Sequence, residues 1–167
     1  MGFGTHPHNS MEILTYVIQG ELEHKDSMGN GSIIKAGQLQ YMSAGSGVQH
    51  SEFNPSQENP VHFLQIWIVP QEKGGQPRYR EMDSKALRQT DSLHLLASPD
   101  SREHSIGLRQ DAELYFGNLG ADKEIVAPNS PNYPYAWLQV IRGQILLNGE
   151  AYGPGDGCGI EGMMPAI

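Results

Sequence analysis

The sequence contains little cysteine, little positive charge and no long apolar run. Its one cysteine, Cys158, cannot form a disulfide within the chain, which fits a reducing compartment. Lys and Arg number 11 against 19 Asp and Glu, so a surface that binds nucleic acid directly is not expected. No apolar stretch is long enough to cross a bilayer, and the first residues have neither the basic start nor the apolar stretch of a secretion signal. These absences predict a soluble cytoplasmic protein whose partners are neither nucleic acids nor membranes.

Glycine and proline, in contrast, are frequent. The 20 glycines and 11 prolines separate short stretches rich in β-branched and aromatic residues, a pattern typical of many short strands joined by turns. We expect strands over residues 12–19, 21–26, 32–35, 38–42, 48–54, 61–69, 93–97, 105–108, 112–119, 123–126, 135–141 and 144–147. Residues 70–92 are more polar and are expected to form a crossing segment, with a short helical turn over residues 81–89. The pattern therefore predicts an all-β fold.

Two pairs of potential metal ligands share the same spacing. His6 and His8 are separated by one residue, and so are His50 and Glu52. Residues i and i+2 of a strand point to the same face, so each pair can direct both side chains into one space. Three imidazoles and one carboxylate form a ligand set for a divalent transition metal that leaves positions open for water or substrate. A single His-x-His pair is common on surface strands, and the second pair is what makes a metal site the expected function of this segment.

Other chemically distinctive residues have simpler interpretations. His24 stands among charged residues and is expected at a solvated strand end, whereas His62 opens an apolar strand and is expected in the core. Trp67 and Trp137 lie in apolar stretches, which favours core packing over a substrate platform. Cys158 lies between glycines with no nearby base or second cysteine, so a nucleophilic role is not expected.

The chain contains an internal repeat. Residues 17–22 (VIQGEL) resemble residues 140–145 (VIRGQI), and a glycine-containing turn follows each of them, at residues 35–38 and 153–156. Such a repeat predicts two similar β-units in one chain.

The metal ligands are not repeated. The positions that correspond to His6 and His8 in the second copy are occupied by Asn129 and Pro131. Proline has no coordinating side chain, so the second β-unit is expected to lack a metal site.

Several stretches resemble the pirin family of the cupin superfamily. They are GFGTHPH at residues 2–8, MEILTYVIQGELEHKDSMGNG at 11–31, MSAGSGVQHSEFNPS at 42–56, FLQIWIVP at 63–70 and, more weakly, LASPD at 96–100. The resemblance covers nearly the whole chain and is most specific in residues 2–70. It implies a bicupin, with a metal-binding N-terminal cupin-like β-barrel over residues 1–70, a crossing segment over residues 71–104, and a C-terminal cupin-like β-barrel without metal over residues 105–167.

The resemblance also implies a ligand set. Carried over residue by residue, the pirin ligands fall on His6, His8, His50 and Glu52. A general cupin pattern offers Glu12 as an alternative carboxylate, because Glu12 would share the face of the two histidines if residues 6–12 formed one strand. The pirin resemblance favours Glu52 as the carboxylate ligand. Glu12 is then expected either to face solvent or to contact the ligands without binding the metal itself.

For function, the resemblance implies a metal-dependent oxidoreductase of the quercetin 2,3-dioxygenase type, which cleaves a flavonol such as quercetin. The expected cofactor is one divalent transition metal, Fe(II) in the first place, and the ligand types alone leave Zn, Mn, Ni and Co as alternatives. The flavonol would bind through its deprotonated 3-hydroxyl group, and Glu52 is expected to act catalytically by taking that proton. The alternatives are a non-enzymatic metal-binding protein, redox-sensing or transcription-regulatory, with a protein partner, and an inactive truncated pirin.

Pirins carry sequence before the stretch that matches residues 2–8 and further β-structure beyond the matched C-terminal region. The chain therefore resembles a pirin shortened at both ends. We expect its first barrel to be incompletely closed near residues 2–8 and the open sheet edge to favour self-association. Metal binding and quercetin turnover are then expected to be weaker than in a full-length relative.

Overall fold

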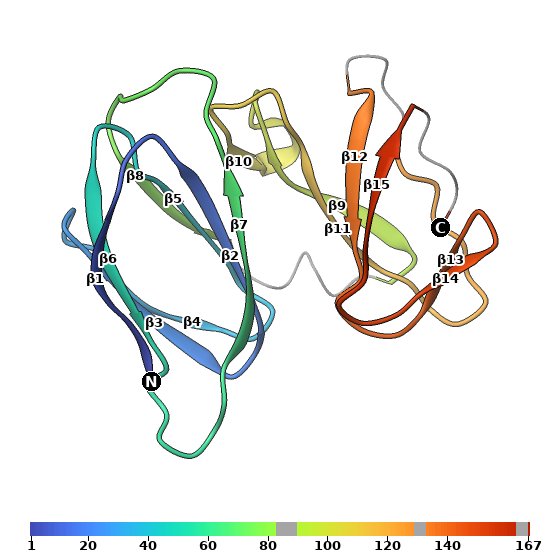
Figure 1. The fold of residues 1–167 in the computed structure, drawn as a ribbon, viewed down its shortest axis with the longest axis horizontal. Helices are drawn as coiled ribbons and strands as arrows, with labels where there is room; N and C mark the ends of the chain where they lie inside the picture. The colour runs from blue at the N-terminus through green and yellow to red at the C-terminus, as the bar shows by residue number, and fades with distance from the viewer. Residues whose placement is uncertain (83–89, 129–132, 163–166) are drawn as a thin grey trace. The chain divides into compact units, whose positions relative to one another are not determined.

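The chain folds into two compact units (Figure 1), as seen in a computed structural model that describes residues 1–82, 90–128, 133–162 and 167. The first unit consists of Met1–Arg88 and Leu95–Leu114, and the second of Gln89–His94 and Tyr115–Ile167. Regular structure in the described residues is β, apart from one 3-10 turn at Arg102–His104. The predicted all-β fold is confirmed. None of the described helical segments is long and apolar enough to span a membrane.

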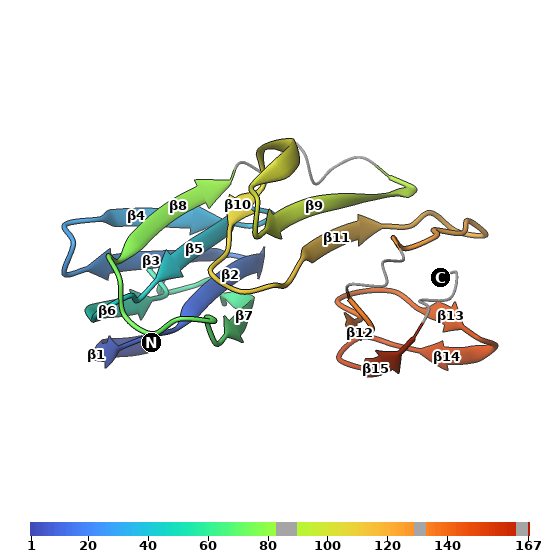
Figure 2. The ribbon, with the colours of Figure 1, turned by 90° about the horizontal axis from the view of Figure 1, so that it is seen from above.

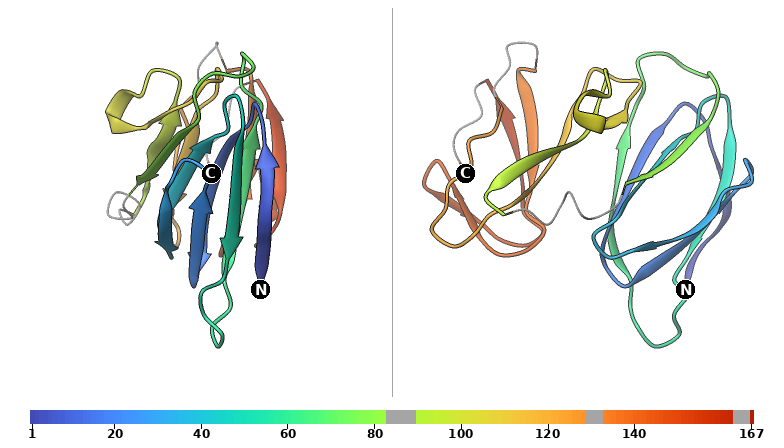
Figure 3. Two further views of the ribbon diagram at one scale, coloured as in Figure 1. Left: turned by 90° about the vertical axis from the view of Figure 1, so that its left-hand side faces the viewer. Right: turned by 180° about the vertical axis from the view of Figure 1, so that it is seen from behind.

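The first unit contains two four-stranded antiparallel sheets that face each other (Figure 1, Figure 3). Its strands are β1 (Gly2–His8), β2 (Glu12–Gln19), β3 (Glu21–Asp26), β4 (Gly31–Lys35), β5 (Leu39–Ser43), β6 (Val48–Phe53), β7 (His62–Ile68) and β8 (Arg78–Met82). One sheet has the order β1–β6–β3–β4, and the other has the order β7–β2–β5–β8.

The core of the first unit lies between these sheets. Val17 on β2 packs with Leu22 on β3 and Ile34 on β4, and Phe63 on β7 packs against the same cluster. The cluster draws on both sheets, and its three central side chains are at most 2% exposed. Burying each such side chain stabilises the fold by about 1.5–3 kcal/mol, so this cluster helps to hold the two sheets together.

β1 lies at an edge of its sheet, paired only with β6 among the described strands. Pro7 stands opposite Gln49 in this pair and has no amide proton to donate, which suits an edge position. The expected self-association through this edge stays a prediction.

Seven further strands follow in the described residues (Figure 2). They are β9 (Ser92–Ser98), β10 (Ile106–Gly107), β11 (Leu114–Asn118), β12 (Tyr135–Gln139), β13 (Ile145–Leu147), β14 (Glu150–Tyr152) and β15 (Gly157–Glu161). β9 lies between β10 and β11 in a three-stranded sheet, and in the second unit β12 pairs with β15 and β13 with β14.

The repeat in the sequence corresponds to a repeated turn in the structure. The amide of Gly37 donates to the carbonyl of Val17 at 2.8 Å, and the amide of Gly155 donates to the carbonyl of Val140 at 3.0 Å. Both glycines have positive φ, 86° and 91°, a conformation that side chains with a Cβ disfavour. The hairpin formed by β3 and β4 therefore has a shorter counterpart in β13 and β14.

Some expected elements differ from the observed ones. β8 falls inside the expected crossing segment 71–104, yet it pairs with β5 in the first unit. It is a polar edge strand with the sequence RYREM, so it lacks the apolar pattern that identifies a strand. Residues 123–126 form only an isolated bridge at Val126 rather than a strand. The helical turn expected over residues 81–89 falls largely outside the described residues, as do Asn129 and Pro131.

Candidate metal centre

Two adjacent strands carry the four predicted ligands. His6 and His8 lie on β1, and His50 and Glu52 lie on β6. The strands are antiparallel, with His6 opposite His50 and Phe3 opposite Glu52. Because side chains alternate along a strand, His50 and Glu52 point to the same face, and they are only 2% and 1% exposed.

The three histidine rings gather at one place. Ring centroids are 4.4 Å apart for His6 and His50, and 4.9 Å apart for His8 and each of the other two rings. The candidate ligand atoms of the three rings lie within 4.8 Å of one another. A metal with bonds of about 2.1 Å spans at most about 4.2 Å between opposite ligand atoms, so small side-chain movements would bring the rings into ligand geometry.

A second group of potential ligand atoms shares His50 with the first. His24, His50 and Glu52 also lie within 4.8 Å of one another, and all three are buried. Glu52 therefore lies beside His50 and His24, next to the cluster of three histidines. The structure brings the four predicted residues into one region and adds His24.

The expectation that His24 stands at a solvated strand end is wrong, because its side chain is 0% exposed. β3 lies between β6 and β4, and His24 shares its inward face with the core residue Leu22. The charged neighbours Glu23 and Lys25 point the other way. In the sequence, His24 follows the apolar Leu22 by two residues, and this spacing indicates that both side chains point to the same inward face of the strand.

Two buried polar atoms fit a metal ion. Nε2 of His8 and Oε1 of Glu52 have no hydrogen-bond partner among the described residues. Leaving such an atom unsatisfied costs about 1–3 kcal/mol, and a metal ion bound beside either atom would satisfy it. Hydrogen bonds orient two of the side chains through their other polar atoms: Nδ1 of His6 donates to the carbonyl of Gly4 at 2.8 Å, and Oε2 of Glu52 accepts from Nε2 of Gln65 at 2.9 Å. The side chains therefore form a cluster suited to one metal ion.

Glu12 is not part of this cluster. A turn at Ser10, with φ of 49°, separates β1 from β2, so residues 6–12 do not form one strand. Glu12 is 0% exposed, and its carboxylate accepts hydrogen bonds from Tyr41 Oη, from Ser43 Oγ at 2.6 Å and from the Arg109 amide at 3.1 Å. These donors occupy the oxygens that a metal would need, and the carboxylate does not face solvent.

Exposed aromatic rings lie beside the cluster. Trp67 on β7 is 55% exposed, and its ring lies edge-on to His8 at 5.1 Å. Phe3 on β1 is 58% exposed and lies 6.4 Å from the ring of His6.

The expectation that Trp67, Trp137 and His62 belong to the core is wrong. Both tryptophans are more than half exposed, and His62 is also exposed. Trp67 lies on the same face of β7 as Phe63 and Gln65, but β7 is an edge strand, so no further strand of the sheet lies beside the ring to cover it. An apolar run in the sequence does not distinguish an edge strand from a central one.

Burial controls the protonation of the cluster. Burial, together with the nearby His6, His24 and His8, lowers the pKa of His50 to about 3. Burial also lowers the pKa of His8, with His6 adding to the effect. Burial raises the pKa of Glu52, and the hydrogen bond from Gln65 opposes this rise. The imidazoles of His8 and His50 are therefore kept neutral, which is the form that binds metals.

The free energy of unfolding of the metal-free protein should rise with pH between about 3 and 6.5 because of His50. In that window the unfolded state binds a proton at His50 that the folded state does not, which gives a slope of up to about 1.4 kcal/mol per pH unit. Glu52 acts in the opposite direction above pH 4.5, because its pKa is raised in the folded state. Denaturant unfolding with a chelator present, repeated across this window, measures the slope. In His50→Asn the slope of the unfolding free energy against pH should decrease by the contribution of one proton. An unchanged slope would contradict a lowered pKa for His50.

Comparison with known proteins agrees with the fold and the cluster. Residues 1–68 match the pirin family, and residues 95–164 match the quercetinase C-terminal cupin domain. A quercetin 2,3-dioxygenase of Escherichia coli is 45% identical over 159 residues, which are 95% of this chain and 67% of that protein. A putative quercetin 2,3-dioxygenase of Mycobacterium tuberculosis is 48% identical over 151 residues, which are 89% of this chain and 60% of that protein.

Solved structures extend the comparison. The bacterial pirin YhhW of Escherichia coli in complex with nickel(II) has a TM-score of 0.89 and 42% identity, covering 99% of this chain and 69% of that one. A second structure of YhhW has a TM-score of 0.88 at the same identity. The chain thus spans about two thirds of the length of these relatives. On these matches, the chain belongs to the pirin family and has its cupin fold.

Proposed function

We propose that His6, His8, His50 and Glu52 bind one divalent transition metal, and that this centre oxidises a flavonol such as quercetin. The observation that carries the proposal is a pair of buried atoms without partners, Nε2 of His8 and Oε1 of Glu52, in two groups of potential ligand atoms that share His50. The names of the relatives, quercetin 2,3-dioxygenases and a pirin in complex with nickel(II), support the same chemistry. Fe(II) is the metal proposed for the reaction, and nickel is the first alternative.

When bound, the metal supplies a Lewis acid that lowers the pKa of the flavonol 3-hydroxyl group and brings the substrate close to dioxygen. The carboxylate of Glu52 is proposed to take the hydroxyl proton when the metal does not hold it tightly as a ligand. Gln65 holds one oxygen of that carboxylate and thereby orients the other. Trp67 and Phe3 offer exposed faces on which the planar flavonol can stack.

Dioxygen uptake with quercetin tests the proposal. The chain loaded anaerobically with Fe(II) should bind one equivalent of metal, and on addition of air it should consume dioxygen as the quercetin absorbance falls. The double variant His6→Ala with His8→Ala should lose both the metal and the turnover. Bound metal without turnover would favour a non-enzymatic metal-binding protein instead, and absence of bound metal would refute the site. A second tight equivalent that survives the double variant would contradict the expectation that the second unit holds no metal.

A further inference from the structure

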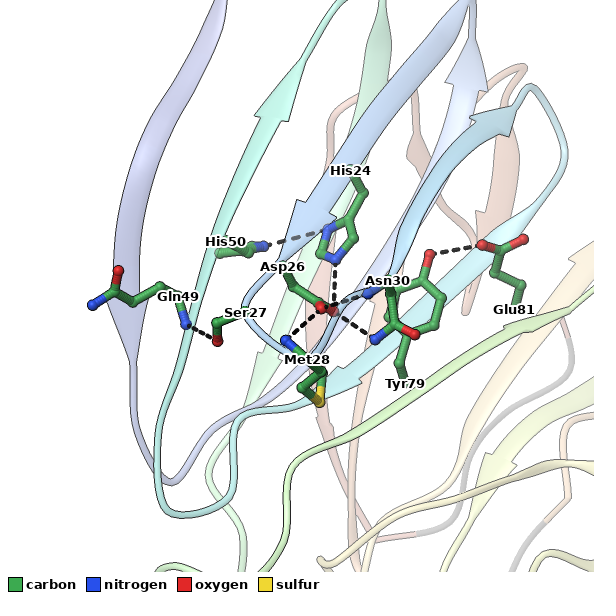
Figure 4. A network of polar contacts seen from close by, with 9 residues as sticks. All are labelled: His24, Asp26, Ser27, Met28, Asn30, Gln49, His50, Tyr79 and Glu81. Carbon is green, nitrogen blue, oxygen red and sulfur yellow. Dashed lines mark hydrogen bonds and ion pairs between the residues drawn. The ribbon is translucent and has the colours of Figure 1, made fainter.

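A buried chain of polar contacts runs from the β3–β4 turn to His50 (Figure 4). Asp26 ends β3, and its carboxylate faces the turn. Oδ1 accepts from the amides of Met28 at 2.9 Å and Asn30 at 3.0 Å, and Oδ2 accepts from Nδ2 of Asn30 at 2.8 Å. Oδ2 also faces Nε2 of His24 at 3.2 Å, and the side chains of His24 and Asp26 are both 0% exposed.

These contacts determine where the protons lie. The carboxylate of Asp26 can only accept, so the proton shared with His24 belongs to Nε2 of His24. In the neutral ring Nδ1 of His24 then carries a lone pair, and it faces Nδ1 of His50 at 3.5 Å. Two lone pairs or two N–H groups would repel each other at this separation, so the proton between the rings belongs to His50. Its Nε2 is then unprotonated.

We propose that His24 and Asp26 together fix the tautomer of His50, so that His50 presents an unprotonated Nε2 to the metal. His24 is then a positioning residue rather than a ligand, because both of its ring nitrogens are engaged. Tyr79 stacks on the His24 ring with centroids 5.1 Å apart and planes 28° apart. This contact keeps the ring in the orientation needed for the contacts from Asp26 through His24 to His50, which we call the relay. The inference rests on the proposed metal centre.

The tautomer of His50 in the metal-free protein is the direct test. The ¹⁵N chemical shifts of the ring nitrogens, measured on the full chain with labelled histidine and a chelator, report which nitrogen carries the proton. We expect Nδ1 of His50 to be protonated and Nε2 to be bare, with the reverse arrangement in His24. A proton on Nε2 of His50, or protons on both nitrogens of His24, would overturn the proposal whether or not the protein oxidises quercetin.

Asp26→Asn should switch this arrangement. The backbone amides of Met28 and Asn30 hold one side-chain oxygen, so the new NH₂ group takes the place of Oδ2 and faces His24, and the side-chain amide of Asn30 turns to offer its oxygen to that group. His24 then takes its proton on Nδ1, and His50 has to carry its own on Nε2, the metal side. Calorimetric titration with Ni(II) should show an affinity about 10–100-fold lower, the range seen when the partner of a metal-binding histidine is removed. An unchanged affinity with an unchanged His50 tautomer would overturn the proposal.

Two further variants separate the relay from general stability. His24→Phe keeps a ring against Tyr79 but removes the acceptor, so Ni(II) affinity should fall by less than in Asp26→Asn. Ser27→Ala is the matched control: it removes the acceptor for the Gln49 amide, at 3.1 Å, in the same turn but outside the relay. It should leave both the Ni(II) affinity and the His50 tautomer unchanged, and an equal loss in Ser27→Ala and Asp26→Asn would overturn the positioning role. Failure of quercetin oxidation alone, with the tautomer and Ni(II) results as expected, would count only against the proposed function.

Discussion

His50→Ala should abolish metal binding, lowering the affinity for Fe(II) or Ni(II) by well over the roughly 100-fold loss that follows removal of a supporting partner. His50 is shared by both groups of potential ligand atoms found in the described part of the chain. Removing its imidazole therefore breaks both groups, and no other side chain on β6 can replace it from the same face except Glu52, which is already part of the set. Metal analysis of the purified protein and calorimetric titration measure the loss.

His62→Ala is the control for this experiment. His62 lies in the same unit, on β7, but it is exposed and outside both groups of ligand atoms. Its replacement should leave metal content and affinity unchanged. Retention of about one equivalent of metal by His50→Ala would contradict the proposed centre.

Glu12→Ala should lower the free energy of unfolding by about 3 kcal/mol, because two buried donors and one partly buried donor lose their acceptor at once. Tyr41, Ser43 and the amide of Arg109 all donate to this carboxylate. The substitution also leaves a void where the side chain was fully buried. Urea denaturation monitored by tryptophan fluorescence gives the change.

Glu21→Ala provides the matched comparison. Glu21 belongs to β3 of the same unit, but its side chain is 46% exposed and its contact with Lys35 is 3.9 Å long. Its loss should change the stability by less than about 0.5 kcal/mol, as is usual for surface substitutions. Equal effects of the two substitutions would show that the hydrogen bonds of Glu12 contribute little.

Much of the first unit could be predicted from local sequence. The predicted strands over residues 12–19 and 21–26 coincide with β2 and β3, because apolar β-branched residues and the glycine turn between them are local signals. The spacing in His6-x-His8 and His50-x-Glu52 also sufficed to put each pair on one face of a strand, since the alternation of side chains is a property of the strand itself.

Tertiary structure decided which faces are covered and which donors meet. The burial of His24 depends on β3 lying between two other strands, and the exposure of Trp67 depends on β7 lying at an edge. The carboxylate of Glu12 is satisfied by donors that include an amide 97 residues further along the chain. The contact between His24 and His50 likewise joins residues 26 apart. The sequence alone was enough to predict most strands of the first unit and the types of the candidate ligands. Strand order and register determined the partner of each buried polar atom, because those partners come from distant segments that only the folded sheets bring together.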